Sequence, residues 1–206
     1  MEVYTTENEQ VDALRRFLAE NGKALVVGVV LGVGALVGWR FWQNHQNDSV
    51  MAASASYQQV TEQLAEGKTD AIAATEKFTA ENKNAYGALA SLELARHYVD
   101  LKDFAKAEQQ LVQALSQTKD ADLLAVVNLR LARVQLQENK ADDALKTLDA
   151  IKLEGWASQA AEVRGDILAS KGDNQAARDA YNKGLSSNPS QAQQALLRMK
   201  LNNLSS

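Results

Sequence analysis

The most apolar stretch of the chain is an uncharged block that begins at Ala24 and reaches Trp39, within an otherwise polar sequence. With the side chain of Arg40 extended toward lipid headgroups, the block continues through Trp42 and contains about 19 residues. At about 1.5 Å per helical residue it spans roughly 28 Å, close to the roughly 30 Å of a bilayer's hydrocarbon core. Residues 24–42 are therefore predicted to form one transmembrane helix.

Two other interpretations of this block fit its surroundings less well. A secretory signal has a shorter apolar core and a small-residue cleavage site soon after it. The Ala-x-Ala pattern at residues 53–55 lies well past Trp42, across a polar run that keeps it away from a peptidase at the membrane surface. A buried core helix is disfavoured because Trp39 and Trp42 flank Arg40 as interfacial aromatic anchors do. We therefore expect a retained membrane anchor.

The orientation of the anchor follows from the basic residues near its two ends. Arg15, Arg16 and Lys23 precede the block, whereas Arg40 is followed by no further basic residue until Lys68. Because positively charged flanks stay in the cytoplasm, the N-terminus is predicted to be cytoplasmic and the C-terminal part exported. The chain contains no cysteine, which is compatible with an oxidising compartment and excludes disulfide or thiolate-zinc chemistry.

Glycines recur at helical spacing within the predicted span. Gly28 and Gly32 are four residues apart, and so are Gly34 and Gly38. Small residues at this spacing let a second membrane helix approach closely, so they are candidate helix-packing positions. The alternative is that glycine is simply common in membrane helices.

The rest of the chain is rich in alanine and leucine, with apolar residues recurring at three and four positions, which is the helical period. Polar breaks such as "EGKTD", "ENKAD" and "SKGDN" separate the helical stretches. An all-α fold is expected. The organisation that we predict is a cytoplasmic tail, a transmembrane helix, a linker and a folded exported domain, at residues 1–23, 24–42, 43–55 and 56–206.

Aligning the helix after each break reveals an internal repeat of small and large residues. The spacings of 33, 37 and 33 residues are close to the roughly 34-residue tetratricopeptide period. The small residue lets paired helices touch and the larger one, four positions later, fills the next gap. The small positions are Ala74, Ala107, Ala144 and Ala177, and the large ones are Phe78, Leu111, Leu148 and Tyr181.

The last repeat matches the tetratricopeptide pattern best, with Gly165, Gly172 and Pro189 at expected positions. Gln135 and Arg164 stand where the motif usually buries apolar side chains, which predicts shifted or partly exposed turns there. Residues 190–204 have no partner helix and are predicted to cap the solenoid. The alternative fold is a plain helical bundle.

The exported part contains few residues of the kinds that form enzyme active sites. His45 lies beside the membrane and His97 lies within a helix, with no serine or carboxylate arrangement around it that indicates a triad. One histidine cannot anchor a typical zinc site, and Asp142 and Asp143 suit the first turn of a helix. After residue 42, 18 basic residues face 21 acidic ones, so nucleic-acid binding is not indicated. No catalytic, cofactor or metal site is predicted.

A helical-repeat solenoid does offer a groove for a polypeptide partner. In the predicted register the first helices present two equivalent sets of side chains to this groove, an apolar surface with two cations. The alternative is that the leucines among them are ordinary core. The candidate residues are Leu92, Arg96 and Val99, then Leu129, Arg133 and Leu136.

The anchor, its orientation and the repeats together resemble the YfgM family of ancillary subunits of the SecYEG translocon. The similarity runs over nearly the full length, with "AENGKALVVGVVLGVGALVGWRFW", "NKNAYGALASLELA", "VNLRLARVQLQ" and "ALKTLDAIKLEGWA" as its most telling blocks. The resemblance implies a bacterial inner-membrane protein whose tetratricopeptide-like domain lies in the periplasm.

The resemblance also implies partners that no spacing or composition indicates. These are the membrane-anchored periplasmic chaperone PpiD, the SecYEG translocon and translocating polypeptides, which the protein would help to pass to periplasmic chaperones. A lesser role of the cytoplasmic tail near a stress-response regulator is implied as well. The alternatives are a tethered scaffold for another envelope assembly and an undetected hydrolase or transferase.

Overall fold

The computed structural model of the chain describes residues 7–204. The first six residues of the predicted tail, and residues 205–206, lie outside the described part. Regular structure between residues 7 and 204 is entirely helical. The chain divides into two compact units, Met1–Ala52 and Ala53–Ser206, which are described separately.

The first unit consists of the N-terminal part of α1 (Glu7–Ala65). Large apolar side chains of residues 25–42 are exposed along it, from 42% at Leu25 to 76% at Phe41. Within residues 7–204, α1 is the one helix long and apolar enough to cross a membrane, with a mean hydropathy of 2.0 in its apolar window. The predicted span 24–42 lies within this helix. Residues 43–55, predicted as a linker, continue it without a break.

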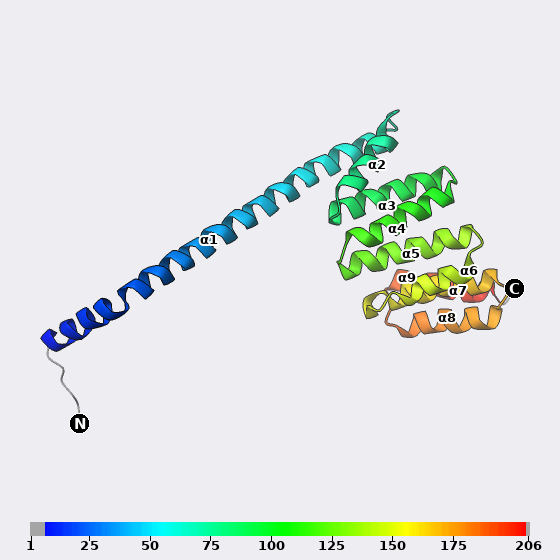
Figure 1. Ribbon diagram of the computed structural model, residues 1–206. Helices are drawn as coiled ribbons and strands as arrows, with labels where there is room; N and C mark the ends of the chain where they lie inside the picture. The colour runs from blue at the N-terminus through cyan, green and yellow to red at the C-terminus, as the bar shows by residue number, and fades with distance from the viewer. Residues whose placement is uncertain (1–6, 205–206) are drawn as a thin grey trace, which may run out of the picture. The chain divides into compact units, whose positions relative to one another are not determined.

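The second unit contains the last residues of α1 and a succession of shorter helices joined by tight turns (Figure 1). The helices are α2 (Ala71–Glu81), α3 (Ala85–Asp100), α4 (Phe104–Gln117), α5 (Ala121–Gln137), α6 (Ala141–Asp149), the 3-10 helix η1 (Glu154–Trp156), α7 (Ala157–Ser170), α8 (Asn174–Ser186) and α9 (Gln191–Asn203).

The turns within the pairs α3–α4, α5–α6 and α7–α8 share one geometry. Each has a residue with a left-handed φ, at Lys102 (61°), Asn139 (61°) and Gly172 (80°). The next backbone N–H then donates to a carbonyl five residues earlier, for example from Asp103 to Tyr98 at 2.8 Å. Such turns satisfy carbonyls at the end of the first helix and direct the chain back antiparallel. The repeat seen in the sequence is thus also a repeat of backbone conformation.

The helix pairs stack in chain order, with α4 against α5 and α6 against α7 (Figure 1). Side chains at the small and large repeat positions form the contacts. Ala107, Ala144 and Ala177 are each fully buried. Leu111, Leu148 and Tyr181 are at most 3% exposed, and they belong to three successive core clusters. In the earliest repeat Ala74 is half-buried and Phe78 is buried. The predicted all-α, tetratricopeptide-like solenoid is confirmed.

Gln135 departs from the prediction of an exposed or shifted turn. Its side chain is buried, donates to Glu108 Oε1 at 3.0 Å and accepts from Thr147 Oγ1 at 2.8 Å. A buried amide is tolerated because both of its ends are hydrogen-bonded. Arg164 is half-buried and pairs with Asp149.

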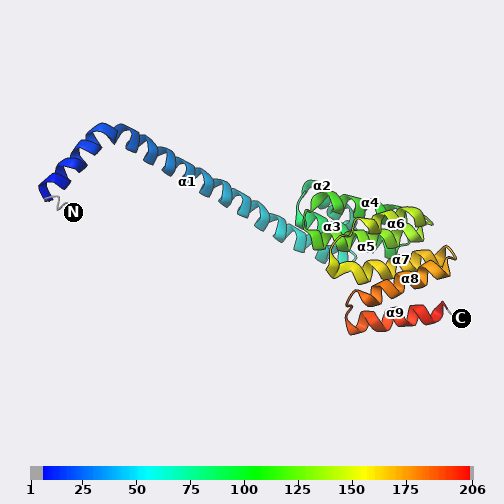
Figure 2. The ribbon, with the colours of Figure 1, turned by 90° about the horizontal axis from the view of Figure 1, so that it is seen from below.

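The C-terminal end of the stack is covered by α9. Figure 2 shows α9 beside α8 as the last helix of this end. Leu197 of α9 is fully buried against Ala177 and Tyr181, and Ser190 caps the helix by accepting from the Gln193 N–H. This helix falls within residues 190–204, the segment for which a cap was predicted.

Candidate partner-binding groove

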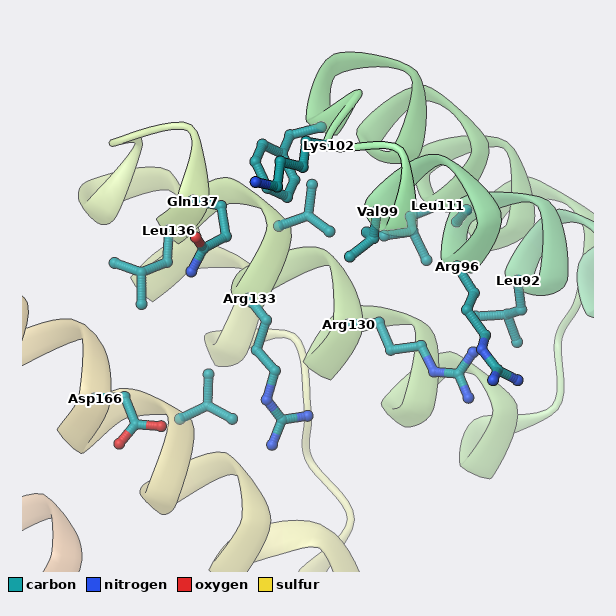
Figure 3. Close-up of a pocket in the computed structure, with 14 residues that line it drawn as sticks. Leu92, Arg96, Val99, Lys102, Leu111, Arg130, Arg133, Leu136, Gln137 and Asp166 are labelled. Atoms are coloured by element: carbon teal, nitrogen blue, oxygen red, sulfur yellow. The ribbon is translucent and has the colours of Figure 1, made fainter. Parts of the chain in front are cut away.

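A cavity of about 630 Å³ lies along the first helices of the repeats, α3, α5 and α7, and reaches the start of α4 (Figure 3). We call it the groove cavity. It falls within the range of roughly 300–1,000 Å³ that is usual for ligand sites. Its lining residues are Leu92, Ala95, Arg96, Val99, Lys102, Phe104, Leu111, Arg130, Arg133, Val134, Leu136, Gln137, Val163 and Asp166.

The candidate groove residues are largely brought together here. Leu92, Arg96, Val99, Arg133 and Leu136 all line the groove cavity. The sixth candidate, Leu129, is not among the lining residues and is 4% exposed within the second core cluster.

Leu92 is also only 4% exposed, so Leu92 and Leu129 act mainly as core, which was the alternative interpretation. Val99, Phe104 and Leu136 are half-buried, so they present the accessible apolar surface of the cavity. Beneath them Leu111, Val134 and Val163 are at most 5% exposed. The cavity thus has an apolar floor that a partner side chain can contact.

Four cationic side chains surround this floor, at Arg96, Lys102, Arg130 and Arg133. Arg96 is exposed and its nearest carboxylate, Glu93, is 4.0 Å away at the limit of an ion pair. Among the side chains that the structure describes, neither Lys102 nor Arg130 forms an ion pair. Positive charge is therefore available at the rim rather than neutralised within the domain.

The α7 end of the cavity carries the opposite charge, and the protein neutralises it itself. Lys200 of α9 lies 2.8 Å from Glu162 Oε1 and 2.5 Å from Asp166 Oδ2. Arg133 lies 3.7 Å from the other oxygen of Glu162, and Tyr181 donates to Asp166 at 2.8 Å. The capping helix thus supplies the cation that two carboxylates of α7 require.

The pKa values at this end reflect the pairing. Burial raises the pKa of Glu162, but hydrogen bonds from Lys200 and Gln193, with the charges of Lys200 and Arg133, outweigh it and hold the pKa below its ordinary value. Burial lowers the pKa of Lys200, whereas Asp166 and Glu162 raise it further, so the net shift is upward. Burial and the hydrogen bond to Asp166 raise the pKa of the Tyr181 hydroxyl. These shifts keep Glu162 and Lys200 charged, and the Tyr181 hydroxyl protonated, at neutral pH.

Sequence reasoning missed Lys102, Arg130 and Asp166 as groove residues. Arg130 precedes Arg133 by three residues, a spacing that places both on one helix face. Asp166 follows Arg133 by 33 residues, the local repeat length, so the register itself could have placed it there. Lys102 had no such signal, because its position depends on the left-handed turn after α3.

Other candidate chemistry in the described residues is sparse. No group of three or more His, Asp or Glu side chains among them could hold a metal ion. His97 is half-buried with its ring 6.5 Å from that of Tyr98, a packing contact. Asp142 and Asp143 lie in the first turn of α6, where Asp142 pairs with Lys171.

In the first unit, a Cβ added at Gly28, Gly32, Gly34 or Gly38 would meet nothing within 4 Å, so α1 is uncovered at these candidate helix-packing positions.

Comparison with known proteins adds relatives that share the whole length of the chain. A model of the tetratricopeptide repeat-like domain family matches residues 15–206. The ancillary SecYEG translocon subunit of Escherichia coli is 58% identical over 205 residues, covering 100% of both chains. The chain belongs to the family of ancillary SecYEG translocon subunits.

More distant members of this family also match over nearly their full length. The ancillary SecYEG translocon subunit of Haemophilus influenzae is 39% identical, covering 98% of this chain and 99% of that protein. The subunit of Neisseria gonorrhoeae is 28% identical over 99% of this chain. Among solved structures, the crystal structure of MamA protein superposes with a TM-score of 0.53 at 23% identity, covering 66% of this chain and 74% of that chain. That likeness concerns the fold alone.

Proposed function

We propose that the protein is a non-enzymatic adaptor of the bacterial inner membrane that associates with the SecYEG translocon. Its C-terminal domain faces the periplasm, binds the membrane-anchored chaperone PpiD and helps to pass translocated polypeptides to periplasmic chaperones. The cytoplasmic tail has a lesser role in the envelope stress response. Membership of the family of ancillary SecYEG translocon subunits supports the translocon association, and the family resemblance supplies the chaperone partner.

The observation that carries the proposal is the groove cavity of the tetratricopeptide-like domain. An accessible apolar floor at Val99, Phe104 and Leu136 is surrounded by four cations, and two of them, Lys102 and Arg130, form no ion pair among the described side chains. Protein interfaces commonly combine an apolar centre with a polar rim, and arginine is enriched in them. Helical-repeat domains use the surface of their first helices to bind polypeptides.

The membrane helix supports the location of this domain beside a translocon. Its large apolar side chains are exposed in the isolated chain, and burying them in lipid removes an apolar surface that a soluble protein would not keep. The basic residues Arg15, Arg16 and Lys23 before the span favour a cytoplasmic N-terminus. The exposed glycine positions Gly28 and Gly32 leave room for a neighbouring membrane helix.

Site-specific photocrosslinking in cells tests the proposal. Benzoylphenylalanine in place of Gln137, an exposed residue of the groove cavity, should yield an adduct with PpiD. The same group in place of Val33, exposed within the span, should yield adducts with a translocon subunit. Asp179, an exposed residue of α8 that does not line the cavity, is the matched control and should yield neither. Adducts with other envelope proteins in place of these partners would instead support a scaffold for a different assembly.

A further inference from the structure

We propose that the groove cavity selects an acidic-apolar polypeptide segment, whose carboxylates bind Arg96 and Arg130 while its apolar side chains contact Val99, Phe104 and Leu136. This inference rests on the proposed function, in which the same cavity binds a polypeptide. It adds the chemical class of the segment that is recognised.

Two arginines of neighbouring first helices, Arg96 and Arg130, line the groove cavity. Arg96 extends from α3 and Arg130 from α5, and Figure 3 shows both side chains at the same end of the cavity. A carboxylate bound at this end of the cavity would be attracted by both cations. Arg130 has no ion pair among the described side chains, and the exposed contact of Arg96 with Glu93 at 4.0 Å contributes little.

The geometry of guanidinium groups favours one kind of anion. Their planar array of N–H donors matches a carboxylate, which can accept two parallel hydrogen bonds. Lys102, at the turn after α3, adds a third cation to the same lining and forms no ion pair among the described side chains. The unpaired positive charge therefore exceeds what one carboxylate would neutralise, which favours a segment with more than one acidic side chain.

The α7 end of the cavity disfavours basic segments, because its carboxylates are already paired. Glu162 and Asp166 could attract a lysine or arginine of a partner, but Lys200 already occupies them at 2.8 Å and 2.5 Å. Arg133 adds a contact with Glu162 at 3.7 Å. A basic segment would have to displace the Lys200 side chain from these carboxylates. An acidic segment meets no free carboxylate there.

The apolar floor of the groove cavity favours a segment that also carries apolar side chains. Val99, Phe104 and Leu136 are half-buried, so each has surface left to cover, and they lie over the buried Leu111 and Val134. An anion without apolar groups would leave this surface in water. A polypeptide that alternates acidic and apolar residues can contact both features, because successive side chains of an extended chain point to opposite sides. A lipid headgroup phosphate would satisfy the arginines but not the floor, so the polypeptide is the occupant that we infer.

The experiment uses the full chain in phosphatidylcholine nanodiscs and fluorescence anisotropy of labelled octapeptides. The peptides are acetylated and C-terminally amidated, so that their charge resides in side chains. In one, glutamate alternates with leucine and phenylalanine; in the others, glutamine or lysine replaces every glutamate. The glutamate peptide should bind at least tenfold more tightly than either of the other two. Its affinity should fall as salt is raised, because exposed charges are screened.

A matched pair of variants assigns the binding to the two arginines. Arg96→Gln combined with Arg130→Gln should lower the affinity for the glutamate peptide at least tenfold. The affinity for the glutamine peptide should change by less than twofold. Lys183→Gln combined with Arg198→Gln removes the same net charge from exposed positions outside the cavity and should change neither affinity by more than twofold. Thermal unfolding of both variants checks that the domain is intact.

Three outcomes would overturn the inference: equal binding of the glutamate and glutamine peptides, tightest binding of the lysine peptide, or equal losses in the two double variants. Displacement of the peptide by phosphatidylglycerol vesicles but not by phosphatidylcholine vesicles would assign the arginines to lipid phosphate and would also overturn it. The crosslink from position 137 separates this failure from failure of the proposed function. If the adduct with PpiD persists while the glutamate peptide shows no preference, the cavity binds a partner of another class.

Discussion

Lys200 in the capping helix lies 2.5 Å from Asp166 Oδ2 in the first helix of the last repeat. The side chain of Lys200 is 20% exposed and that of Asp166 is 30% exposed, so the pair is partly shielded from water. Lys200 also reaches Glu162, which is 8% exposed. Lys200 thus connects α9, which covers the end of the solenoid, to the α7 end of the groove cavity. We expect both the stability of the domain and the charge of the cavity to depend on this side chain.

Replacing this cation should destabilise the domain. Lys200→Met retains most of the apolar stem but leaves Glu162 buried without its main partner. Loss of charge-assisted hydrogen bonds to a buried carboxylate should lower the free energy of unfolding by about 1–3 kcal/mol. Urea unfolding of residues 47–206 measures the change. Lys183→Met, at an exposed position of α8, is the matched control and should cost less than about 0.5 kcal/mol. Equal costs for the two variants would show that the cluster does not hold α9 in place.

The effect of pH on this cluster has a defined sign. The pKa of Glu162 is lowered in the folded state, so its contribution to stability is present above the ordinary glutamate pKa and is lost as pH falls through the lowered value. The charged groups around it are Lys200 of α9, Arg133 of α5 and Asp166 of α7, with the Tyr181 hydroxyl of α8 bound to Asp166.

The cost of Lys200→Met should therefore shrink as pH is lowered from about 7 to about 3, because a protonated Glu162 no longer needs a cation. Urea midpoints of the wild type and the variant, measured side by side across this range, report the difference. A cost that stays constant or grows on acidification would contradict the pairing.

Close packing between the helices of the last repeat predicts another change in stability. A Cβ added at Gly165 would lie 2.2 Å from Cε1 of Tyr181, so Gly165→Ala forces the ring or the helix to move. Overpacking should cost about 1–3 kcal/mol, although alanine favours a helix by about 1 kcal/mol over glycine. At Gly155 an added Cβ meets nothing within 4 Å, and Gly155→Ala should change stability by less than about 0.5 kcal/mol. A Gly165→Ala variant that is more stable than the wild type would mean that the helix propensity of alanine outweighs overpacking. It would also mean that α7 and α8 are not in close contact at Gly165 and Tyr181.

The fold was accessible to sequence reasoning because it repeats. Ala107, Ala144 and Ala177 are legible in the sequence as small residues at near-equal spacing, and the structure buries all three. Gln135 misled that reasoning, because its burial depends on Glu108 and Thr147, which lie in the helices that flank α5 in the chain. A pattern read along one helix does not reveal which polar partners the neighbouring helices supply.

The site was accessible only in part, for a related reason. Arg96 and Arg133 could be placed on the groove because each occupies the same position of its repeat. The role of Lys200 could not be predicted, because its partners Glu162 and Asp166 lie 34 to 38 residues away and α9 belongs to no repeat. Residues 43–55, predicted as a linker that begins with a polar run, are helical in the structure.

The orientation of the anchor is open to a direct test. A reporter enzyme that is active only outside the cytoplasm should be active when it is fused after Ser206, because Arg15, Arg16 and Lys23 keep the other end inside. Replacing these three residues by glutamine should reduce the fraction with this orientation. Activity of the reporter only when it is fused at the N-terminus would reverse the assignment, and a mature chain beginning near Ser56 would show that the apolar block is a cleaved signal.

The central claim is that partner recognition resides in the tetratricopeptide-like domain rather than in the membrane helix. Residues 53–206 form a compact unit with their own core clusters, so a fragment of residues 47–206 should fold without lipid. The most direct measurement is the binding of this fragment to the periplasmic part of PpiD by calorimetry, with Arg96→Glu combined with Arg133→Glu as the variant. We predict that the fragment binds and that the variant binds more weakly, with the greater loss at low salt. Absence of binding by the fragment, with chaperone association retained by residues 1–52 in the membrane, would contradict the account and make the membrane helix the recognition element.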